Sequence, residues 1–272
     1  MKENTNVKHL VMYSGGASSA FVAKWVVDKF GRDDVILFFT DTQWEDEDNY
    51  RFMEEAASYI GLEITRVVDG RTPEDVFFEN RFLGNARHAQ CSEELKVKQT
   101  LMFIENMRLK GEEPIIYFGI GPNETHRADS LRFHYTHLPL DPVEVRFPMI
   151  DSMSTDIKAR FIIENEWGIK LPRMYHLGFH HANCGGRCVR AGMHHFANLY
   201  LVWPDRYAEF EDMEERFRNK FELDVAMMKR EGTPYTLKQF RLEVIEKMSP
   251  EELHTYAKEK DVEAIPCFCS FS

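Results

Sequence analysis

The sequence predicts an α/β fold: a doubly wound, mostly parallel sheet followed by a helical C-terminal region with a cysteine and histidine motif. Two observations support this prediction. Up to about residue 172, short apolar runs alternate with stretches of helical periodicity, which is the pattern of consecutive β–α–β units. Beyond that point the alternation stops, and a Cys/His-rich segment over 176–195 leads into acidic amphipathic stretches. We therefore expect an α/β domain over residues 1–172 and a helical region over residues 173–272.

The individual elements can be placed from their residues. Apolar positions of the first helix recur every three or four residues, and Gly31 and Gly61 stand where helix C-caps are expected. Strands are expected over 9–13, 35–40, 62–68, 115–120 and 143–149, and helices over 19–30, 46–60 and 92–107. In such a sheet the crossovers are right-handed, and ligands bind at the carboxyl ends of the strands.

The composition excludes several classes of protein. With 272 residues, 43% of them apolar and 29% charged, the chain can form a sizeable core and is not globally disordered. A net charge of −11 repels a nucleic-acid backbone, so a nucleic-acid acceptor is disfavoured unless Lys96, Lys98, Arg108 and Lys110 form a basic face. No apolar run reaches the roughly 20 residues that span a bilayer, and the first residues are polar. We expect a cytoplasmic protein without a membrane partner.

Residues 14–19, Ser-Gly-Gly-Ala-Ser-Ser, lie between the first predicted strand and the first predicted helix. Glycines let the backbone approach a ligand, hydroxyls donate hydrogen bonds, and a helix start offers unpaired amides, so the segment can hold phosphate. It is neither a Walker loop nor a dinucleotide fingerprint, because the lysine and the third glycine are missing. The alternative is a plain turn in which Ser18 or Ser19 caps the helix.

Five motifs together resemble those of the PP-loop ATP pyrophosphatases, in particular their phosphoadenosine-phosphosulfate reductase branch. Residues 14–19 are similar to the SGGxDS signature of that superfamily. The others are Asp41-Thr42-Gln43-Trp44-Glu45, Cys91-Ser92-Glu93-Glu94-Leu95-Lys96, Gly119-Ile120-Gly121-Pro122-Asn123-Glu124-Thr125-His126-Arg127-Ala128 and Asn183-Cys184-Gly185-Gly186-Arg187-Cys188-Val189-Arg190-Ala191-Gly192. Two departures stand out: Ser18 replaces the family's aspartate, and the cysteine pair is spaced C-x3-C rather than C-x2-C.

The resemblance implies an enzyme that binds ATP and Mg²⁺ and cleaves ATP between the α and β phosphates, releasing pyrophosphate and adenylating a substrate. The nucleotide-binding residues that it implies are Ser14, Gly15, Gly16, Ala17, Ser18, Ser19, Asp41, Thr42, Gly119, Gly121 and Arg127. The catalytic residues that it implies are Ser18, Asp41, Lys96 and Arg127. Since Ser18 removes a carboxylate, Asp41 or Glu45 is the candidate to supply negative charge to a metal.

Three of these residues also have a structural interpretation. Arg127 is expected on a loop at the ligand edge of the sheet, where a guanidinium suits phosphate, and the alternative is a solvated loop arginine. Lys96 is expected inside a helix, where a surface lysine is the alternative. Asp41 follows a strand, and the alternative is a turn or N-cap aspartate.

Five cysteines are too few and too unevenly spaced for a secreted disulfide framework, so we expect metal or redox chemistry. Cys184 and Cys188 flank two glycines that allow a tight backbone path around a metal, and Cys91 belongs to a motif near the same sheet edge. Three cysteines suggest a [4Fe-4S] cluster with one open iron, which resembles that of the PP-loop tRNA thiolation enzymes. The alternatives are free thiols and a zinc site completed by His180, His181, His194 or His195.

Cys267 and Cys269 lie near the chain end, where a thiol is accessible. The reductases have a reactive C-terminal cysteine, but their E-C-G-I-H tail is missing, so an incidental tail is the alternative.

The leading functional hypothesis is ATP-dependent adenylation for sulfur transfer to an unknown acceptor. The others are a thiol-dependent phosphoadenosine-phosphosulfate or adenylyl-sulfate reductase, and a nucleotide-sensing protein with weak catalysis. The sequence leaves open whether the chain forms a homo-oligomer.

Overall fold

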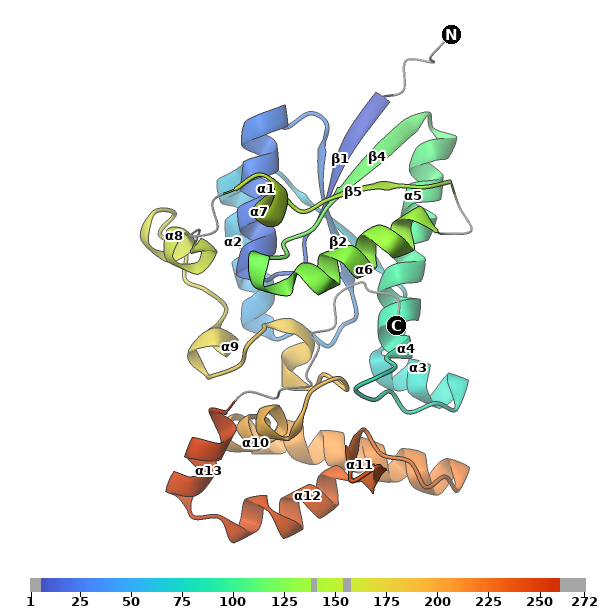
Figure 1. Ribbon diagram of the computed structural model, residues 1–272, viewed down its shortest axis with the longest axis vertical. Helices are drawn as coiled ribbons and strands as arrows, with labels where there is room; N and C mark the ends of the chain where they lie inside the picture. Colours follow the sequence, from blue (N-terminus) through green and yellow to red (C-terminus); the bar gives the residue numbers. More distant parts are fainter. Residues whose placement is uncertain (1–5, 138–140, 154–157, 260–272) are drawn as a thin grey trace.

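The computed structural model describes residues 6–137, 141–153 and 158–259, and a five-stranded sheet lies at its centre (Figure 1). The strands are β1 (Asn6–Met12), β2 (Val35–Asp41), β3 (Ile64–Val68), β4 (Glu112–Tyr117) and β5 (Glu144–Arg146). Their order across the sheet is β3-β2-β1-β4-β5, and every neighbouring pair is parallel. The predicted α/β class and its parallel sheet are therefore confirmed.

Helices cover both faces of the sheet. Val11 of β1 and Tyr13 directly after it belong to one buried cluster, and Leu10 and Met12 of β1 belong to another, because alternate side chains of a strand point to opposite faces. The first cluster is completed by α1 (Ala17–Phe30), α2 (Glu47–Ile60) and α8 (Ala159–Asn165), and the second by α5 (Lys98–Leu109) and α6 (Thr125–Thr136). The near-continuous apolar run of the inner strand β2 follows from this arrangement, since both of its faces are covered.

Local chemistry sets the ends of α2. The Asp46 side chain accepts a hydrogen bond from the amide of Asp48 at 3.1 Å and caps the first turn. Gly61 closes the helix in the left-handed region, with a φ of 83°. The prediction of a helix over 46–60 is confirmed.

Other predicted boundaries were wrong. β4 ends at Tyr117, so residues 118–120 form a loop at the carboxyl end of the strand. β5 is short because Pro148 starts the helix α7 (Pro148–Asp151). The helix predicted from residue 92 starts earlier, as α4 (Gln90–Ser92), and passes through a π-helical segment (Glu93–Val97) into α5. Such segments are frequent at functional sites, and this one carries Lys96.

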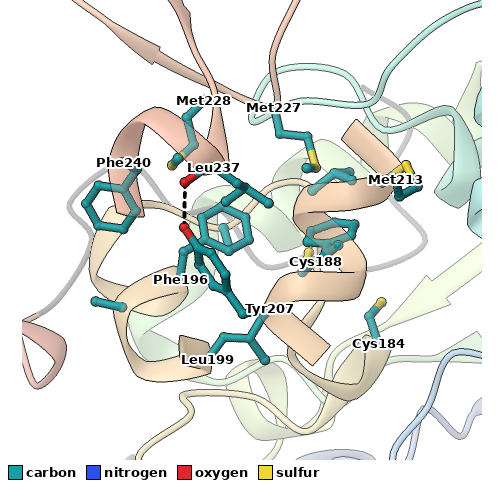
Figure 2. Packing of buried hydrophobic residues seen from close by; sticks show 14 of the residues in the cluster. Cys184, Cys188, Phe196, Leu199, Tyr207, Met213, Met227, Met228, Leu237 and Phe240 are labelled. Carbon is teal, nitrogen blue, oxygen red and sulfur yellow. Dashed lines mark hydrogen bonds between the residues drawn. The ribbon is translucent and has the colours of Figure 1, made fainter. Parts of the chain in front are cut away.

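The C-terminal region is helical, as predicted, but also contains an antiparallel hairpin that the sequence analysis missed. Its elements are α9 (Arg173–His176), α10 (Met193–Val202), α11 (Pro204–Phe221), β6 (Met228–Arg230), β7 (Thr233–Tyr235), α12 (Leu237–Glu243) and α13 (Pro250–Ala257). Figure 2 shows its packing, in which Tyr207 donates a hydrogen bond to the carbonyl oxygen of Leu237 at 2.7 Å. Throughout the described ranges, the helices are too short or too polar to cross a membrane.

The helical region does not build its core alone. Its buried cluster includes Trp44 from the loop after β2, Phe77 from α3 (Pro73–Asn80), and Leu83 from the segment that follows. The Trp44 ring packs edge-on against Phe210 of α11, with 5.7 Å between the ring centroids. The two parts predicted from the sequence thus share this cluster, while the two clusters on the faces of the sheet belong to the α/β part.

Candidate functional site

The strand order places a switch point between β1 and β4. From β1 the chain moves to β2 and β3 on one side, and it later returns to β4 and β5 on the other. The loops after β1 and β4 therefore lead away in opposite directions, and ligands of open parallel sheets bind in the crevice between such loops. These loops contain residues 14–16 and 118–121, which belong to two of the motifs found in the sequence.

Gly119 lets these two loops touch. A Cβ atom on this residue would lie 2.5 Å from the amide nitrogen of Ser19 and 2.6 Å from the carbonyl carbon of Ser18. Because both neighbours are backbone atoms, no side chain fits at this position. A Cβ on Gly121 would have no neighbour within 4 Å. Gly119 therefore shapes the crevice by packing, whereas Gly121 leaves room for a ligand.

The loop between β1 and α1 has the backbone of an anion site. Gly15 is left-handed, with a φ of 78°, and a Cβ there would lie 2.6 Å from the Asn49 side chain. Gly16 is the N-cap of α1, and the Ser19 hydroxyl donates a hydrogen bond to its carbonyl oxygen at 2.8 Å. Neither Ser18 nor Ser19 caps the helix, so the alternative of a serine-capped turn was wrong. The first turn of α1 is left without a side-chain cap and suits an anion.

One side chain does reach this helix end, the phenol of Tyr175 on α9. The amide of Ala17 donates a hydrogen bond to the Tyr175 hydroxyl at 3.4 Å. The Arg160 guanidinium of α8 lies 3.9 Å from the centre of the Tyr175 ring, and burial raises the pKa of that phenol. Neither residue was predicted from the sequence, because they belong to no motif and only the fold brings them to the loop.

The two predicted cations are both buried. Lys96 lies on the π-helical segment, with its Nζ 4.0 Å from Oε1 of Glu45. Arg127 lies in the first turn of α6 and pairs with Glu124. The expectation of a loop position for Arg127 was wrong, because α6 begins at Thr125. The alternatives of a surface lysine and a solvated arginine were also wrong, since both side chains are less than a tenth exposed.

Asp41 holds the turn at the end of β2. Its Oδ1 accepts hydrogen bonds from the amide of Gln43 at 2.7 Å and the hydroxyl of Tyr50 at 2.8 Å, and its Oδ2 pairs with Arg66. The turn interpretation of Asp41 is confirmed, while its role toward a nucleotide stays a prediction. Both carboxylate oxygens already have partners within the protein.

Glu45 is the carboxylate that lies deepest at this edge. Its side chain is 1% exposed, and its Oε2 accepts hydrogen bonds from the amide of Cys184 at 2.8 Å and from Asn49 Nδ2 at 3.5 Å. Burial raises the pKa of Glu45, while the charge of Lys96 and the amide of Cys184 oppose that rise. Glu45 thus connects the loop after β2, the π-helical segment and the cysteine motif.

The cysteine motif forms a tight left-handed turn beside Glu45. Cys184, Gly185 and Gly186 have φ values of 59°, 55° and 85°. A Cβ on Gly185 would lie 2.8 Å from the carbonyl oxygen of Trp44, so close packing as well as φ requires this glycine. A left-handed cysteine is sterically costly, and such conformations concentrate at functional sites.

Cys184 and Cys188 are buried free thiols that contact each other. Their mutual hydrogen bond and burial raise the pKa of Cys184, so its thiol keeps its proton at neutral pH. Cys91 is half-buried and packs against the same cluster. Among the described residues, no three Cys, His, Asp or Glu side chains are grouped to hold a metal ion. The cluster and zinc sites stay predictions, and Cys267 and Cys269 lie outside the described residues.

His181 lies close to the predicted cations. Its ring stacks on that of His195, with 5.5 Å between centroids. Burial, followed by the charges of His195, His180, Lys96 and Arg127, lowers the pKa of His181 to about 3, so its imidazole is neutral. His195 Nε2 donates a hydrogen bond to the carbonyl oxygen of Gly186 at 2.8 Å, which ties this pair to the cysteine motif.

Several buried polar atoms near these segments make no hydrogen bond within the described part of the chain. They are Oγ1 of Thr42, Oδ1 of Asn49, Oγ of Ser92 and Nδ1 of His181. Buried polar atoms in folded proteins nearly always have a partner in the protein, a ligand or ordered water. Because all four belong to segments that carry the predicted site, we expect a polar ligand or ordered water to contact them.

Comparison with known proteins assigns no function to this site. No protein-family model matches the sequence, and no curated protein matches it. The resemblance to the PP-loop enzymes therefore rests on the five motifs, and the functional conclusions below are proposals built on the site.

Proposed function

We propose that this protein binds ATP in the crevice between the β1 and β4 loops and cleaves it between the α and β phosphates, adenylating a substrate for sulfur transfer. The observation that carries the proposal is the glycine-containing loop 14–19, which leads into a helix with a glycine as its N-cap residue at the switch point of a parallel sheet. Helix amides and the helix dipole favour negative charge there. The adenylation and the sulfur transfer rest on the motif resemblance.

Buried cations support phosphate binding in a chain whose net charge is −11. Lys96 and Arg127 are held in the interior by Glu45 and Glu124, so their positive charge is fixed before a ligand arrives. Phosphoryl and adenylyl transfer depend on such pre-positioned charge, because negative charge accumulates on the phosphate oxygens. Arg160, which the motifs did not indicate, adds a third cation beside Tyr175 at the helix end.

The carboxylates and thiols that would hold the two implied metal groups have partners within the protein. Both oxygens of Asp41 are bound by protein donors, and Glu45 is held by Lys96 and the amide of Cys184. The thiols of Cys184 and Cys188 bind each other. We therefore assign no chemical step to protein-bound magnesium or to an iron-sulfur cluster. Free thiols do support our proposal of a cytoplasmic location, since that compartment is reducing.

The same engaged carboxylates favour a second candidate, a nucleotide-sensing protein with weak catalysis. Ser18 stands where the related motif has an aspartate, and Asp41 is neutralised by Arg66. A site with amides and cations but few free carboxylates binds phosphate without strongly binding a catalytic metal. The third candidate, an adenylyl-sulfate reductase, depends on a reactive cysteine near residue 267.

In the deciding experiment, protein purified without oxygen is incubated with magnesium and ATP, and the AMP and pyrophosphate formed are measured. Separately, calorimetry measures the binding of a non-hydrolysable ATP analogue. Visible spectrum, iron and zinc content are recorded on the same sample. We expect binding and pyrophosphate release, and Lys96→Gln is expected to weaken both at least tenfold. Lys98→Gln is the matched control, because Lys98 lies only two residues further along and is exposed.

The outcomes separate the candidates. Analogue binding without pyrophosphate release identifies the sensor, and turnover that appears only in Ser18→Asp strengthens that conclusion. Sulfite release from an adenylyl sulfate, with no pyrophosphate from ATP, identifies the reductase. If no adenine nucleotide binds the parent protein, the proposed function is wrong.

A further inference from the structure

A cavity lies beside the cysteine motif. It has a volume of about 230 Å³ and lies where the loop after β2, α3, α11 and the cysteine motif meet. Trp44 and Phe210 form its apolar part, and Arg187, Glu209 and Arg216 are among its charged lining residues. The resemblance to the PP-loop enzymes assigns no role to this cavity.

The charges in this cavity differ in how tightly they are paired. Arg216 is fully engaged, because its guanidinium binds Glu74 at 2.8 Å and Asp212 at 2.6 Å. Arg187 is not: its Nη1 lies 3.9 Å from Oε2 of Glu209, which exceeds a hydrogen bond. The Nε of Arg187 makes no hydrogen bond to any residue that the structure describes. Arg187 and Glu209 in the wall of the cavity are therefore only loosely paired with each other.

Arg187 is also fixed in place. Its guanidinium lies 4.8 Å from the centre of the Trp44 ring, and its side chain is 20% exposed. Burial and the neighbouring charge of Arg206 lower the pKa of Arg187, so an added negative group would be stabilised there. Glu209 on α11 is 68% exposed at the rim, and its pairing with Arg187 is weak in water.

We propose that this cavity binds a free α-amino acid with an apolar side chain, its carboxylate on Arg187, its ammonium group on Glu209 and its side chain against Trp44 and Phe210. A simple anion is repelled by the three carboxylates of the lining, and a simple cation is repelled by the two guanidinium groups. A zwitterion satisfies both free charges at once. Its site would be one residue from Cys188 and would not involve the nucleotide loop, so the inference is independent of ATP binding.

Calorimetry on the full chain without nucleotide tests this inference with three probes of similar size. L-Norleucine carries both charges, hexanoate lacks the ammonium group and pentylamine lacks the carboxylate. We expect norleucine to bind at least tenfold more tightly than either of the others. Arg187→Gln and Glu209→Gln are each expected to weaken norleucine binding at least tenfold. The matched control is Glu215→Gln on the same helix, where Glu215 pairs with Lys238 outside the cavity.

Several results would overturn the inference. They are absence of norleucine binding, equal binding of hexanoate or pentylamine, and norleucine binding that neither variant changes. Glu209→Gln keeps the test informative if Arg187→Gln disturbs the Trp44 packing, because the Glu209 side chain is mostly exposed. Failure of ATP binding alone would leave this inference intact.

Discussion

Glu214 on α11 is a buried carboxylate far from the motifs, and it anchors the hairpin of the helical region. Its oxygens accept hydrogen bonds from the amides of Met227 at 2.8 Å and Leu237 at 2.6 Å. Burial nevertheless raises the pKa of Glu214 to about 7 from its ordinary 4.5. The folded state therefore binds the carboxyl proton of Glu214 more tightly than the unfolded state does.

This shift predicts a pH-dependent stability. Between the unfolded pKa of about 4.5 and the folded pKa of about 7, the free energy of unfolding contributed by Glu214 should fall as pH rises, by about 3 kcal/mol in total. Denaturant unfolding at pH 5 and pH 7.5 measures the change. Glu214→Gln should flatten it, whereas Glu215→Gln, at a neighbouring carboxylate that is 39% exposed, should not. An unchanged pH profile in Glu214→Gln would show that the carboxylate is ionised when folded.

Tyr175 gives a prediction about the phosphate loop itself. Its hydroxyl accepts from the amide of Ala17, where a phosphate oxygen is expected to bind. Tyr175→Phe should lower stability by about 1 kcal/mol, because the amide loses its partner, and should tighten binding of an ATP analogue about fivefold by removing a competitor. Calorimetry and denaturant unfolding measure the two effects. Tyr59→Phe, at an exposed phenol of α2, is the control. Weaker binding would mean that the hydroxyl contacts the ligand.

At the scale of elements, the contact between the β1 and β4 loops is the feature on which the crevice depends. Gly119→Ala would force a Cβ to within 2.6 Å of the backbone of Ser18 and Ser19, which cannot yield as a flexible side chain does. We expect this substitution to lower the free energy of unfolding by about 1–3 kcal/mol, in the range of overpacking substitutions.

Gly121→Ala is the matched control for stability, two residues away. Its Cβ would meet open space, and its φ of −89° suits alanine. The free energy of unfolding of this variant should stay within about 0.5 kcal/mol of the parent. Equal losses in the two variants would contradict a specific loop contact at Gly119.

At the scale of the whole molecule, the shared core couples the sheet to the helical region. Phe217 of α11 is fully buried and packs edge-on against Phe78 of α3, with 5.4 Å between ring centroids. Phe217→Ala should lower the free energy of unfolding by about 3–5 kcal/mol. Because the core is shared, unfolding curves from far-UV circular dichroism and tryptophan fluorescence should shift together.

The control for this prediction is Phe133→Ala, since Phe133 on α6 is 61% exposed and its loss removes little burial. If only one of the two unfolding curves of Phe217→Ala shifts, by circular dichroism or by tryptophan fluorescence, the helical region unfolds independently. The cooperative unit would then end near residue 172, where the strand–helix alternation of the sequence stops.

The sequence by itself determined the α/β class, the parallel strands, the helix over 46–60 and the position of the loop over 14–19. These features are local: apolar periodicity, an aspartate N-cap and glycines at turns act within a few residues of themselves. The missed hairpin turn at Glu231 and Gly232 was also local, with φ values of 52° and 84°, but glutamate is not a usual residue there.

Only the tertiary structure decided what the charged residues of the site do. Lys96 and Arg127 are buried rather than solvated, Asp41 is bound by Arg66, and Tyr175 reaches the helix end. The partners of Lys96, Asp41 and Tyr175 come from other segments, whereas Arg127 pairs with Glu124 three residues away. A charge is buried only where such a partner offsets its lost hydration. Residues far apart in a chain have no local signature of one another, so the motifs located the site while the packing of the whole chain set its chemistry.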